Sequence, residues 1–464
     1  MVADLVIKNG LVVTPQGIVP GGLSVEGGRI GQIAGDNALP SAREEVDASG
    51  NFIMPGVIDP HIHLGTGAER GMGEAKFAQD VQTESVCAAI AGVTTFLTTT
   101  IFGRFQESYL PTLERAGQIG RAHSLVDFKF NVMIMTRAHL AEIPRLYEEG
   151  VTSFKFVKAY RGEVARRLGI AEVEWDMVYE GLELIKSCGP NAIGMLHAEQ
   201  IDVCEFASQR LLAQGRQDLP AWSEGRPSFC EGIDICTGGL MAHAIGVPLY
   251  IVHNTSRDAV AAIRWLKGRG ARLYGETCPQ YLTLTRQSPL GLYGKASPPL
   301  REDADRESLW QALADGTLDT MGSDHVVLAR KHKEGNGIWD VAPGFDGMGA
   351  ILPILISEGY NKGRLSIERI ARITAENTAR LLGMYPRKGA LVPGADADVI
   401  VVDPHREWVM GAKTLRGGSD FSIYEGLKLR GRALKTFVRG RLVAQDGEAV
   451  AQPPHGVLVA PTGA

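Results

Sequence analysis

Val57-Ile58-Asp59-Pro60-His61-Ile62-His63 places two histidines, one residue apart, at the end of a short apolar run. Side chains alternate between faces in an extended segment, so His61 and His63 point to the same side and can bind one ion together. The pair alone is not specific, because two half-buried histidines at a strand end would give the same pattern. Its meaning depends on which residues end the other strands of the chain.

Apolar segments of strand length recur between residues 55 and 385, and helical patterns such as those around 182–185 and 258–266 lie between them. This alternation predicts an α/β fold with a parallel sheet, and eight such units predict a (β/α)8 TIM-like barrel. The active site of that fold lies at the carboxyl ends of the strands. The predicted strands are 56–61, 94–99, 128–133, 152–156, 192–197, 248–253, 272–276 and 319–323.

Both ends of the chain differ from this middle part and contain short β-type runs separated by glycine-rich turns. Asn9-Gly10 and Gly27-Gly28 are typical of hairpin turns, and similar β-type runs return after residue 390. We therefore expect residues 1–54 and 386–451 to form a smaller β-sandwich domain beside a barrel domain of residues 55–385. Residues 452–464 are expected to be a C-terminal tail that either covers a partner or is disordered.

The composition excludes several classes of protein. Hydrophobic residues make up 44% of the 464 residues, charged residues 22%, and the net charge is only -5, so nothing suggests a nucleic-acid partner. No apolar stretch reaches the about 18 residues of a membrane span, and the N-terminus lacks a signal-peptide pattern. Six cysteines without a C-x-x-C pattern are expected to be reduced thiols in the core. We expect a soluble cytoplasmic protein with no membrane contact.

Further polar residues with nitrogen or oxygen donors end later predicted strands. They are Lys155, His197, His253 and Asp324. A lone histidine at such a position is more typical of the core, and a lone aspartate of a helix N-cap, but donors at several strand ends of one barrel indicate a common site. Imidazole and carboxylate ligands favour Zn²⁺, Mn²⁺ or Fe²⁺ over Ca²⁺, and the lack of thiolate candidates argues against a structural zinc site.

Several sequence motifs are shared with one known family. They are residues 55–63 (PGVIDPHIH), 92–95 (GVTT), 150–156 (GVTSFKF), 276–282 (ETCPQYL), 297–301 (SPPLR), 383–389 (GMYPRKG) and 394–398 (GADAD). Through these motifs almost the whole chain resembles the amidohydrolase superfamily, and specifically its dihydropyrimidinase and hydantoinase branch of cyclic amidohydrolases.

The resemblance implies a binuclear metal centre built on a modified lysine. The family's strand-four lysine, which corresponds to Lys155, reacts with CO2 to form a carbamate (N6-carboxylysine) that bridges two divalent metal ions. A free ammonium would repel a dication, whereas a carbamate is an anionic ligand with two oxygens. We expect zinc, with manganese or iron as alternatives. The implied ligands are His61, His63, Lys155 and Asp324 for one ion, and Lys155, His197 and His253 for the other.

The resemblance also implies catalytic and substrate-binding residues. A hydroxide that bridges the ions would attack a ring amide carbonyl, with Asp324 as base and then acid. Tyr160 would bind the substrate and stabilise the oxyanion, although a packing aromatic is the alternative interpretation. The family binds the ring near its Ser-Pro-Pro-Leu motif, here at Ser297, and near an Asn-Gly-x-Pro-Gly loop. In this chain Asp340, preceded by Trp339, stands at the asparagine position and predicts an altered substrate preference.

Lys158 and the segment after residue 327 are expected to have no catalytic role. Lys158 lies three residues beyond Lys155, so strand alternation sends it to the opposite face, and we expect an ordinary solvated lysine. Residues 328–337 are charged and rich in glycine. They predict a solvated loop, and an active-site lid over 328–342 is the alternative.

The preferred function is hydrolysis of a C–N bond in a cyclic amide, such as a hydantoin, a dihydropyrimidine or a related ureide or imide. Allantoinase-like and dihydroorotase-like hydrolases are the nearest alternatives, because they share the metal chemistry and differ in their substrate loops. A non-catalytic dihydropyrimidinase-related scaffold is disfavoured, since such proteins lose metal ligands and all six positions are present here. By resemblance we also expect a homo-oligomer, either a tetramer or a dimer.

Overall fold

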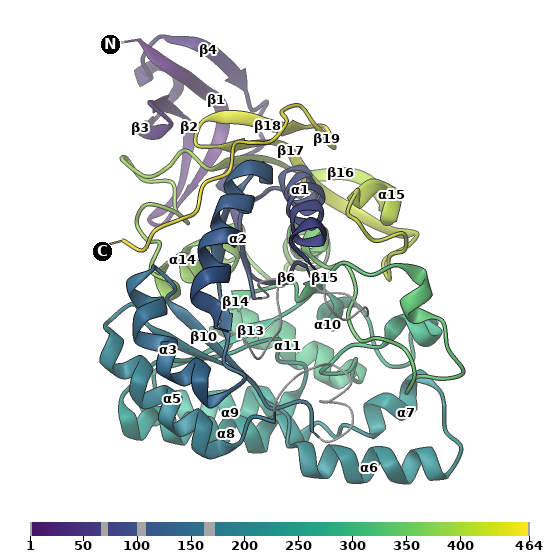
Figure 1. Ribbon diagram of the computed structural model, residues 1–464. Helices are drawn as coiled ribbons and strands as arrows, with labels where there is room; N and C mark the ends of the chain where they lie inside the picture. The colour runs from purple at the N-terminus through teal and green to yellow at the C-terminus, as the bar shows by residue number, and fades with distance from the viewer. Residues whose placement is uncertain (1, 66–72, 100–107, 162–171, 463–464) are drawn as a thin grey trace.

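The computed structural model describes residues 2–65, 73–99, 108–161 and 172–462. The strands of these residues form two parallel sheets in the middle of the chain and a third sheet built from both chain ends. Figure 1 shows the terminal sheet at one end of the molecule, with helices around the parallel strands at the other.

The two parallel sheets contain every strand predicted for the barrel. Their strand orders are β14-β13-β12-β11-β10-β9 and β15-β6-β7-β8. The bounds are β6 Val57–His63, β7 Val93–Thr98, β8 Asp127–Phe130, β9 Val132–Met133, β10 Ser153–Val157, β11 Ile193–His197, β12 Leu249–Ile251, β13 Leu273–Thr277, β14 Thr320–Met321 and β15 His325–Val326. All eight predicted segments therefore contain a strand. The third is split into β8 and β9, and the eighth contains β14, with β15 just beyond its predicted end.

Buried polar side chains lie at the two breaks between consecutive short strands. Between β8 and β9, the Asn131 side chain donates to the carbonyl of Pro60 and accepts from the hydroxyl of Ser153. Between β14 and β15, Ser323 donates from its N–H and its hydroxyl to the carboxylate of Asp59. Because Pro60 and Asp59 both lie in β6, these contacts tie Asn131 and Ser323 to the strand that carries the two histidines.

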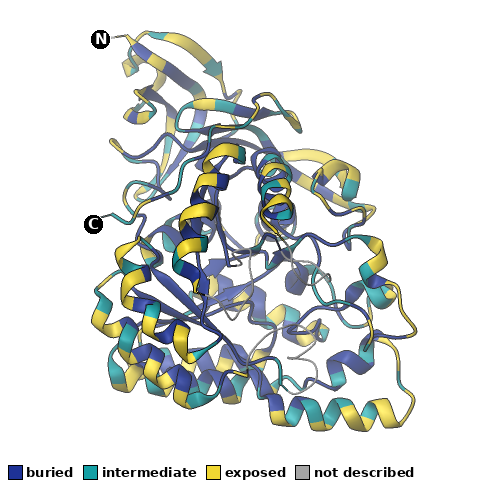
Figure 2. Ribbon diagram, viewed as in Figure 1, coloured by how far each residue is buried: buried dark blue, intermediate teal, exposed yellow. Residues whose placement is uncertain are grey.

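Helices follow most of the parallel strands. Their bounds are α1 Glu74–Ala91, α2 Tyr109–His123, α3 Arg137–Glu148, α5 Trp175–Cys188, α6 Ile201–Ala213, α7 Leu219–Glu224, α8 Phe229–Ile245, α9 Arg257–Gly268, α10 Pro279–Thr283, α11 Asp303–Asp315, α12 Ile351–Ile354, α13 Ile367–Ala371, α14 Asn377–Leu381 and α15 Ala412–Leu415. In α9, Ser256 caps the first turn, Ile263 and Leu266 are buried and Arg264 is exposed, as expected for an amphipathic helix. Figure 2 shows the same division throughout, with buried strands and exposed outer helix faces.

The third sheet contains nine strands from both ends of the chain. Its order is β19-β18-β17-β16-β5-β1-β2-β3, and β4 pairs with β1. The bounds are β1 Ala3–Thr14, β2 Gly17–Glu26, β3 Arg29–Ala34, β4 Ala42–Asp47, β5 Phe52–Pro55, β16 Val399–Met410, β17 Leu427–Val438, β18 Arg441–Gln445 and β19 Glu448–Ala449. β5 pairs with both β1 and β16, and an apolar cluster that includes Ile7, Ile53 and Val401 packs the sheet. The two chain ends therefore share one sheet and one core.

One of the two predicted hairpin turns is wrong. Gly27-Gly28 joins the antiparallel strands β2 and β3, as predicted. Asn9-Gly10 instead lies inside β1, where the register with β2 shifts and Asn9 has a φ of 58°. A Cβ on Gly10 would lie 2.6 Å from the side chain of Ile53. This glycine therefore allows close packing at an irregularity of the strand rather than a reversal of the chain.

The cysteines agree with the expectation of reduced core thiols. All six are free, and four of them are buried. Cys204 and Cys230 pack with Ile201 in a small cluster. Within the described ranges, no helix combines the length and the apolar character that crossing a membrane requires.

The C-terminal tail packs on its own chain, which neither predicted alternative anticipated. The N–H of Phe128 donates to the carbonyl of Val457, and the N–H of Val459 donates to the carbonyl of Phe128. Val459 is 1% exposed and packs in an apolar cluster with Ile58 and Tyr250 from the parallel strands. The tail thus extends the hydrogen bonding of β8 and contributes a side chain to the apolar cluster formed by the parallel strands.

Val459→Ala is expected to lower the free energy of unfolding by about 2 kcal/mol, because the lost methyl groups leave a cavity in this cluster. Denaturation followed by circular dichroism measures the effect. Val450→Ala is the matched control, since Val450 is 54% exposed, and it should change stability by less than about 0.5 kcal/mol. Equal stability of the two variants would show that the tail does not support the core.

Candidate metal centre

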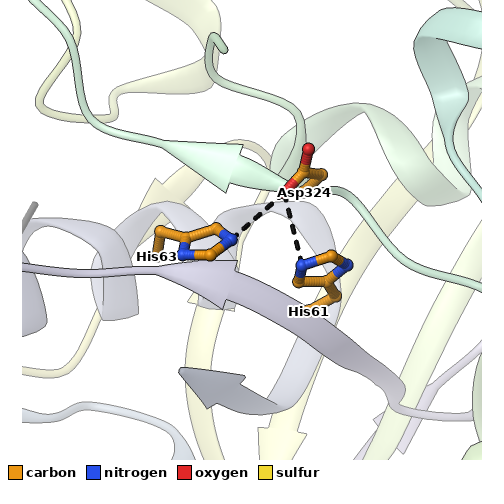
Figure 3. A group of neighbouring side chains, drawn as sticks. All are labelled: His61, His63 and Asp324. Atoms are coloured by element: carbon orange, nitrogen blue, oxygen red, sulfur yellow. Dashed lines mark ion pairs between the residues drawn. The ribbon is translucent and has the colours of Figure 1, made fainter. Parts of the chain in front are cut away.

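His61, His63 and Asp324 lie together at the ends of neighbouring strands (Figure 3). Both histidines come from β6, and Asp324 lies between β14 and β15. Oδ1 of Asp324 is 3.3 Å from Nε2 of His61 and 3.2 Å from Nε2 of His63. The potential ligand atoms of the three residues all lie within 4.8 Å of one another. The alternation along β6 therefore aims both imidazoles at one carboxylate oxygen.

The other predicted ligands come from β10, β11 and the segment after β12. Nζ of Lys155 lies 2.5 Å from Nε2 of His61. The ring of His253 is centred 5.3 Å from that of His61 and 4.3 Å from that of His197. Lys155, His197 and His253 are all buried. The structure thus brings the six predicted ligands to one end of the parallel strands.

Two of these residues have a strained backbone. His253 has a φ of 41° and Asp324 a φ of 51°, in the left-handed region that residues other than glycine rarely adopt. Such conformations persist where surrounding contacts over-determine them, and they cluster at functional sites. The contacts that hold the backbone of His253 and Asp324 in this conformation are therefore part of the site.

The electrostatics of the centre favour the metal-binding forms of its side chains. Burial lowers the pKa of His61 and of His253 well below the usual histidine value, and it also lowers the pKa of Lys155. Burial would raise the pKa of Asp324, but the imidazoles of His61, His63 and His253 hold it well below its ordinary range. Neutral imidazoles and an ionised carboxylate are the forms that bind a metal ion.

A buried nitrogen also fits a metal site. Nδ1 of His253 is buried and has no hydrogen-bond partner among the described residues. Buried polar atoms without a partner are uncommon in native proteins and need an explanation. A cation bound among His253, His197 and the groups around Asp324 would provide that partner.

A second acidic group, made of Asp127, Asp396 and Asp398, is a structural ion cluster. Nζ of Lys388 lies 2.6 Å from Asp127, 2.6 Å from Asp398 and 3.1 Å from Asp396. Arg439, just beyond β17, adds a second positive charge to the cluster by forming an ion pair with Asp127. Because internal cations already lie among the carboxylates, this group joins β8 to the terminal sheet and is not a candidate metal centre.

Two buried carboxylates support the centre, and sequence reasoning gave neither a role. Glu276 accepts hydrogen bonds from Nδ1 of His61 at 3.0 Å and from the hydroxyl of Tyr250 at 2.7 Å. Asp59 accepts from the N–H of His61 at 3.2 Å, in addition to Ser323. Burial raises the pKa of each carboxyl to about 7. Both residues lie in the family motifs. The position of Glu276 at the end of a predicted strand is the sequence feature that could have indicated its role.

Tyr160 and Ser297 lie on the side of the centre that contains His197. Glu199 accepts hydrogen bonds from His197 at 2.8 Å, from Arg226 at 2.8 Å and from the Ser297 hydroxyl at 3.4 Å. The ring of Tyr160 is centred 6.5 Å from that of His197. Burial raises the pKa of Tyr160 against the opposing charge of Arg226 and a hydrogen bond with Ser297. Tyr160 and Ser297, two of the three predicted substrate-binding residues, are therefore in contact with each other.

Asp340 lies farther out than the other predicted site residues. Its side chain is exposed, and its negative charge raises the pKa of Lys295 against the effect of burial. Nε1 of Trp339 donates to the carbonyl of Arg216 at 2.7 Å, and its ring packs edge-on against Trp222 with centroids 5.7 Å apart. Trp339 thus anchors the segment to α7, and the charge partner of Asp340 is Lys295 rather than a predicted ligand.

The segment 328–342 is solvated only in part, because residues 330–331, 334–336 and 340 are exposed but several of the others are buried. Lys333 is 1% exposed, and its Nζ donates to the carbonyls of Lys295 and Ala342 at 3.0 and 2.9 Å. Nζ of Lys295 in turn donates to the carbonyls of Trp339 and Val341 at 3.3 and 2.8 Å. Lys333, which was expected in a solvated loop, and Lys295, from outside the segment, therefore hold this segment through buried hydrogen bonds.

Lys158 is likewise buried and not solvated as predicted. It lies just beyond β10, and its Nζ donates to the carbonyl of Val173 at 3.0 Å and lies 4.9 Å from the ring centre of Trp175. Glu174 is 3.6 Å away and balances its charge. Strand alternation could not predict this burial, because the start of α5 covers the side chain.

Comparisons with known proteins show the family of the chain. The model of the Amidohydrolase family matches residues 250–443. The D-hydantoinase of Geobacillus stearothermophilus is 33% identical over 98% of this chain and 95% of its own length. The L-hydantoinase of Paenarthrobacter aurescens is 30% identical over 98% of both chains. The chain belongs to the amidohydrolase family.

Solved structures show which branch of the amidohydrolase family the chain resembles. The L-hydantoinase (dihydropyrimidinase) of Arthrobacter aurescens has a TM-score of 0.91 at 28% identity, covering 99% of this chain and all of that one. The dihydropyrimidinase of Brevibacillus agri NCHU1002 has a TM-score of 0.88 at 29% identity, covering 98% of each chain. This amidohydrolase therefore falls in the hydantoinase and dihydropyrimidinase branch, as its motifs indicated.

Lys295→Met is expected to destabilise the protein in a pH-dependent way. Burial lowers the pKa of Lys295 to about 7, below the 10.5 of an ordinary lysine. Between these values the unfolded chain binds the extra proton, so the parent gains stability as the pH rises and the variant lacks this gain. The Tm deficit of the variant should therefore be larger near pH ~9.5 than near pH ~7 in thermal melts.

Lys413→Met is the control for this experiment, since Lys413 is an exposed lysine in α15. Its Tm difference from the parent should be small and the same at both pH values. A Tm deficit of Lys295→Met that does not change with pH would contradict the assignment of a buried lysine with a lowered pKa.

Proposed function

We propose that this chain, a cyclic amidohydrolase by family, hydrolyses a C–N bond in the ring of a hydantoin, a dihydropyrimidine or a related ureide or imide. The observation that carries the proposal is the position of Lys155, a buried lysine whose Nζ lies 2.5 Å from His61 among five other side chains suited to bind metal. The names of the relatives, which include both D- and L-hydantoinases, support the substrate class.

The strand pairings support a closed barrel around this site. β15 pairs with β6, β13 pairs with β14, and only residues 322–324 separate β14 from β15. We propose that the parallel strands close into a (β/α)8 barrel of residues 55–385. Residues 1–54 and 386–451 would form the β-sandwich domain, and residues 452–464 the C-terminal tail.

The side chains present fit two divalent cations, with zinc as the expected ion and manganese or iron as alternatives. His61, His63 and Asp324 would hold one cation, His197 and His253 the other, and Lys155 as a carbamate would reach both. The lowered pKa of Lys155 favours the neutral amine that reacts with CO2. When bound, such a pair of ions lowers the pKa of a water molecule toward neutrality and polarises a carbonyl oxygen.

The protein side chains would bind the ring and move the proton. Asp324, kept ionised by its histidine neighbours and with 15% of its side chain exposed, can accept a proton on a carboxylate oxygen and release it to the departing ring nitrogen. The Tyr160 hydroxyl can donate a hydrogen bond to the carbonyl oxygen as negative charge develops there. Main-chain groups near Ser297 would orient the ring, and Asp340 would influence ring choice through Lys295. We further propose a cytoplasmic homo-oligomer, a tetramer or a dimer.

A substrate panel with metal analysis of the same sample tests this function. The panel contains both enantiomers of substituted hydantoins, dihydrouracil, allantoin, dihydroorotate and simple cyclic imides. We expect about two ions per chain and turnover of at least one neutral ring. Preference for allantoin or dihydroorotate would support the alternative hydrolases, and no metal after supplementation would support the non-catalytic scaffold.

Lys155→Ala is expected to remove bound metal and activity together, because it deletes the proposed ligand shared by both ions. Metal content by elemental analysis and hydrolysis of the best ring substrate measure the two effects. A variant that keeps both metals and full activity would contradict the proposed bridge.

Tyr160→Phe is expected to reduce kcat by about 10²- to 10³-fold without changing metal content, because it removes one hydrogen-bond donor to the developing oxyanion. Steady-state kinetics and elemental analysis measure the two quantities. Tyr179→Phe, at an exposed tyrosine on α5, is the matched control and should leave both unchanged. Unchanged kcat in Tyr160→Phe would favour the alternative of a packing aromatic.

A further inference from the structure

Glu276, near the end of β13, contacts both halves of the candidate metal centre. Its Oε1 accepts a hydrogen bond from Nδ1 of His61 at 3.0 Å and from the backbone N–H of His253 at 2.9 Å. His61 is among the proposed ligands of one cation and His253 among those of the other. The Glu276 side chain is fully buried. One carboxylate oxygen therefore connects residues of the two cation positions inside the protein.

The contact with His61 decides which ring nitrogen faces the centre. Both oxygens of Glu276 already accept hydrogen bonds, from the backbone N–H of His253 and from the hydroxyl of Tyr250, so the side chain acts as an acceptor and Nδ1 of His61 carries the hydrogen. In the neutral ring Nε2 then has the free lone pair. Nε2 is the atom that lies 3.3 Å from Asp324 and 2.5 Å from Lys155. Glu276 thus selects the tautomer that presents a ligand nitrogen to the centre.

The contact with His253 supports a strained turn of the backbone. His253 has a φ of 41°, and its N–H donates to the Glu276 side chain. The next residue, Asn254, donates from its backbone N–H at 2.7 Å and from its side-chain amide at 2.8 Å to the main-chain carbonyl of Glu276. Residue 276 therefore supports the turn that carries His253 with both its side chain and its backbone.

The surroundings leave this carboxylate little freedom to move. Its Oε2 accepts from the hydroxyl of Tyr250 at 2.7 Å, and that hydroxyl also lies 2.6 Å from the hydroxyl of Thr320. A Cβ on Gly322 would lie 2.4 Å from Oε2, so only glycine leaves room for the carboxylate on that side. The contacts and this packing hold the Glu276 side chain in one position.

We propose that Glu276 is a positioning residue that prepares both cation positions at once, by fixing the tautomer of His61 and the backbone turn of His253. This inference rests on the ligand set of the proposed function. It predicts that a change at one buried carboxylate weakens the binding of both cations, although Glu276 itself contacts neither.

The test is a titration of metal-free protein with Zn²⁺ alone, in competition with a chromophoric chelator. Glu276→Gln keeps the shape of the side chain and an oxygen acceptor but removes the charge. Glu276→Asp keeps the charge, but its side chain is shorter by one methylene group, so the carboxylate lies farther from His61 and His253. We expect both cations to bind about 10- to 100-fold more weakly in each variant, as is typical when a partner of a metal-binding histidine is lost. The visible spectrum of Co²⁺-loaded protein should also change.

Glu231→Gln is the matched control. Glu231 is a buried glutamate whose hydrogen bonds come from Thr255 and Arg301 and from none of the proposed ligands. It should keep the parent's zinc affinity when thermal melts show that all variants are folded. Parent-like affinity in both Glu276 variants, or an equal loss in Glu231→Gln, would overturn the proposal. A parent that binds two ions but hydrolyses no ring would overturn the proposed function alone, since the titration needs no substrate.

Discussion

Lys155 and His61 bring two basic nitrogens to within 2.5 Å of each other inside the protein, and the rest of the site must satisfy this constraint. Both nitrogens cannot be protonated there, because like charges at that separation repel strongly where water is excluded. Burial accordingly lowers the pKa of both groups. Asp324 and Glu276 place carboxylates at the two opposite nitrogens of the His61 ring. The result is a cluster of neutral bases beside carboxylates, an environment that suits a divalent cation.

The two ends of the parallel strands are stabilised in different ways. At the carboxyl ends, buried hydrogen bonds such as Asp59 to Ser323 and Arg226 to Glu199 orient polar side chains. At the opposite ends, the tail residue Val459 packs in an apolar cluster, and Lys388 joins the strands to the terminal sheet through Asp127. This division agrees with barrel enzymes, in which the carboxyl ends serve catalysis and the amino ends serve stability.

Much of the fold and of the site was predictable because both depend on local pattern. Each apolar segment of strand length became a strand, and alternation along β6 correctly placed His61 and His63 on one side. The errors have a common cause. Lys158, Lys333 and the turn at Asn9-Gly10 were interpreted from their immediate neighbours in sequence. Other segments of the chain bury the two lysines and pack against that turn. The role of Glu276 was missed for the same reason, since its partners come from β6 and the β12 end.

The sequence by itself determined the secondary structure and the set of donor residues at the strand ends, because strand periodicity and side-chain chemistry are properties of short segments. Only the tertiary structure decided which donors meet, which lysines are buried and where the tail lies. These properties depend on contacts between residues far apart in sequence, such as Glu276 with His61 and Phe128 with Val459. Burial then determines the charge states of the site, because the cost of a buried charge depends on neighbours that only folding supplies.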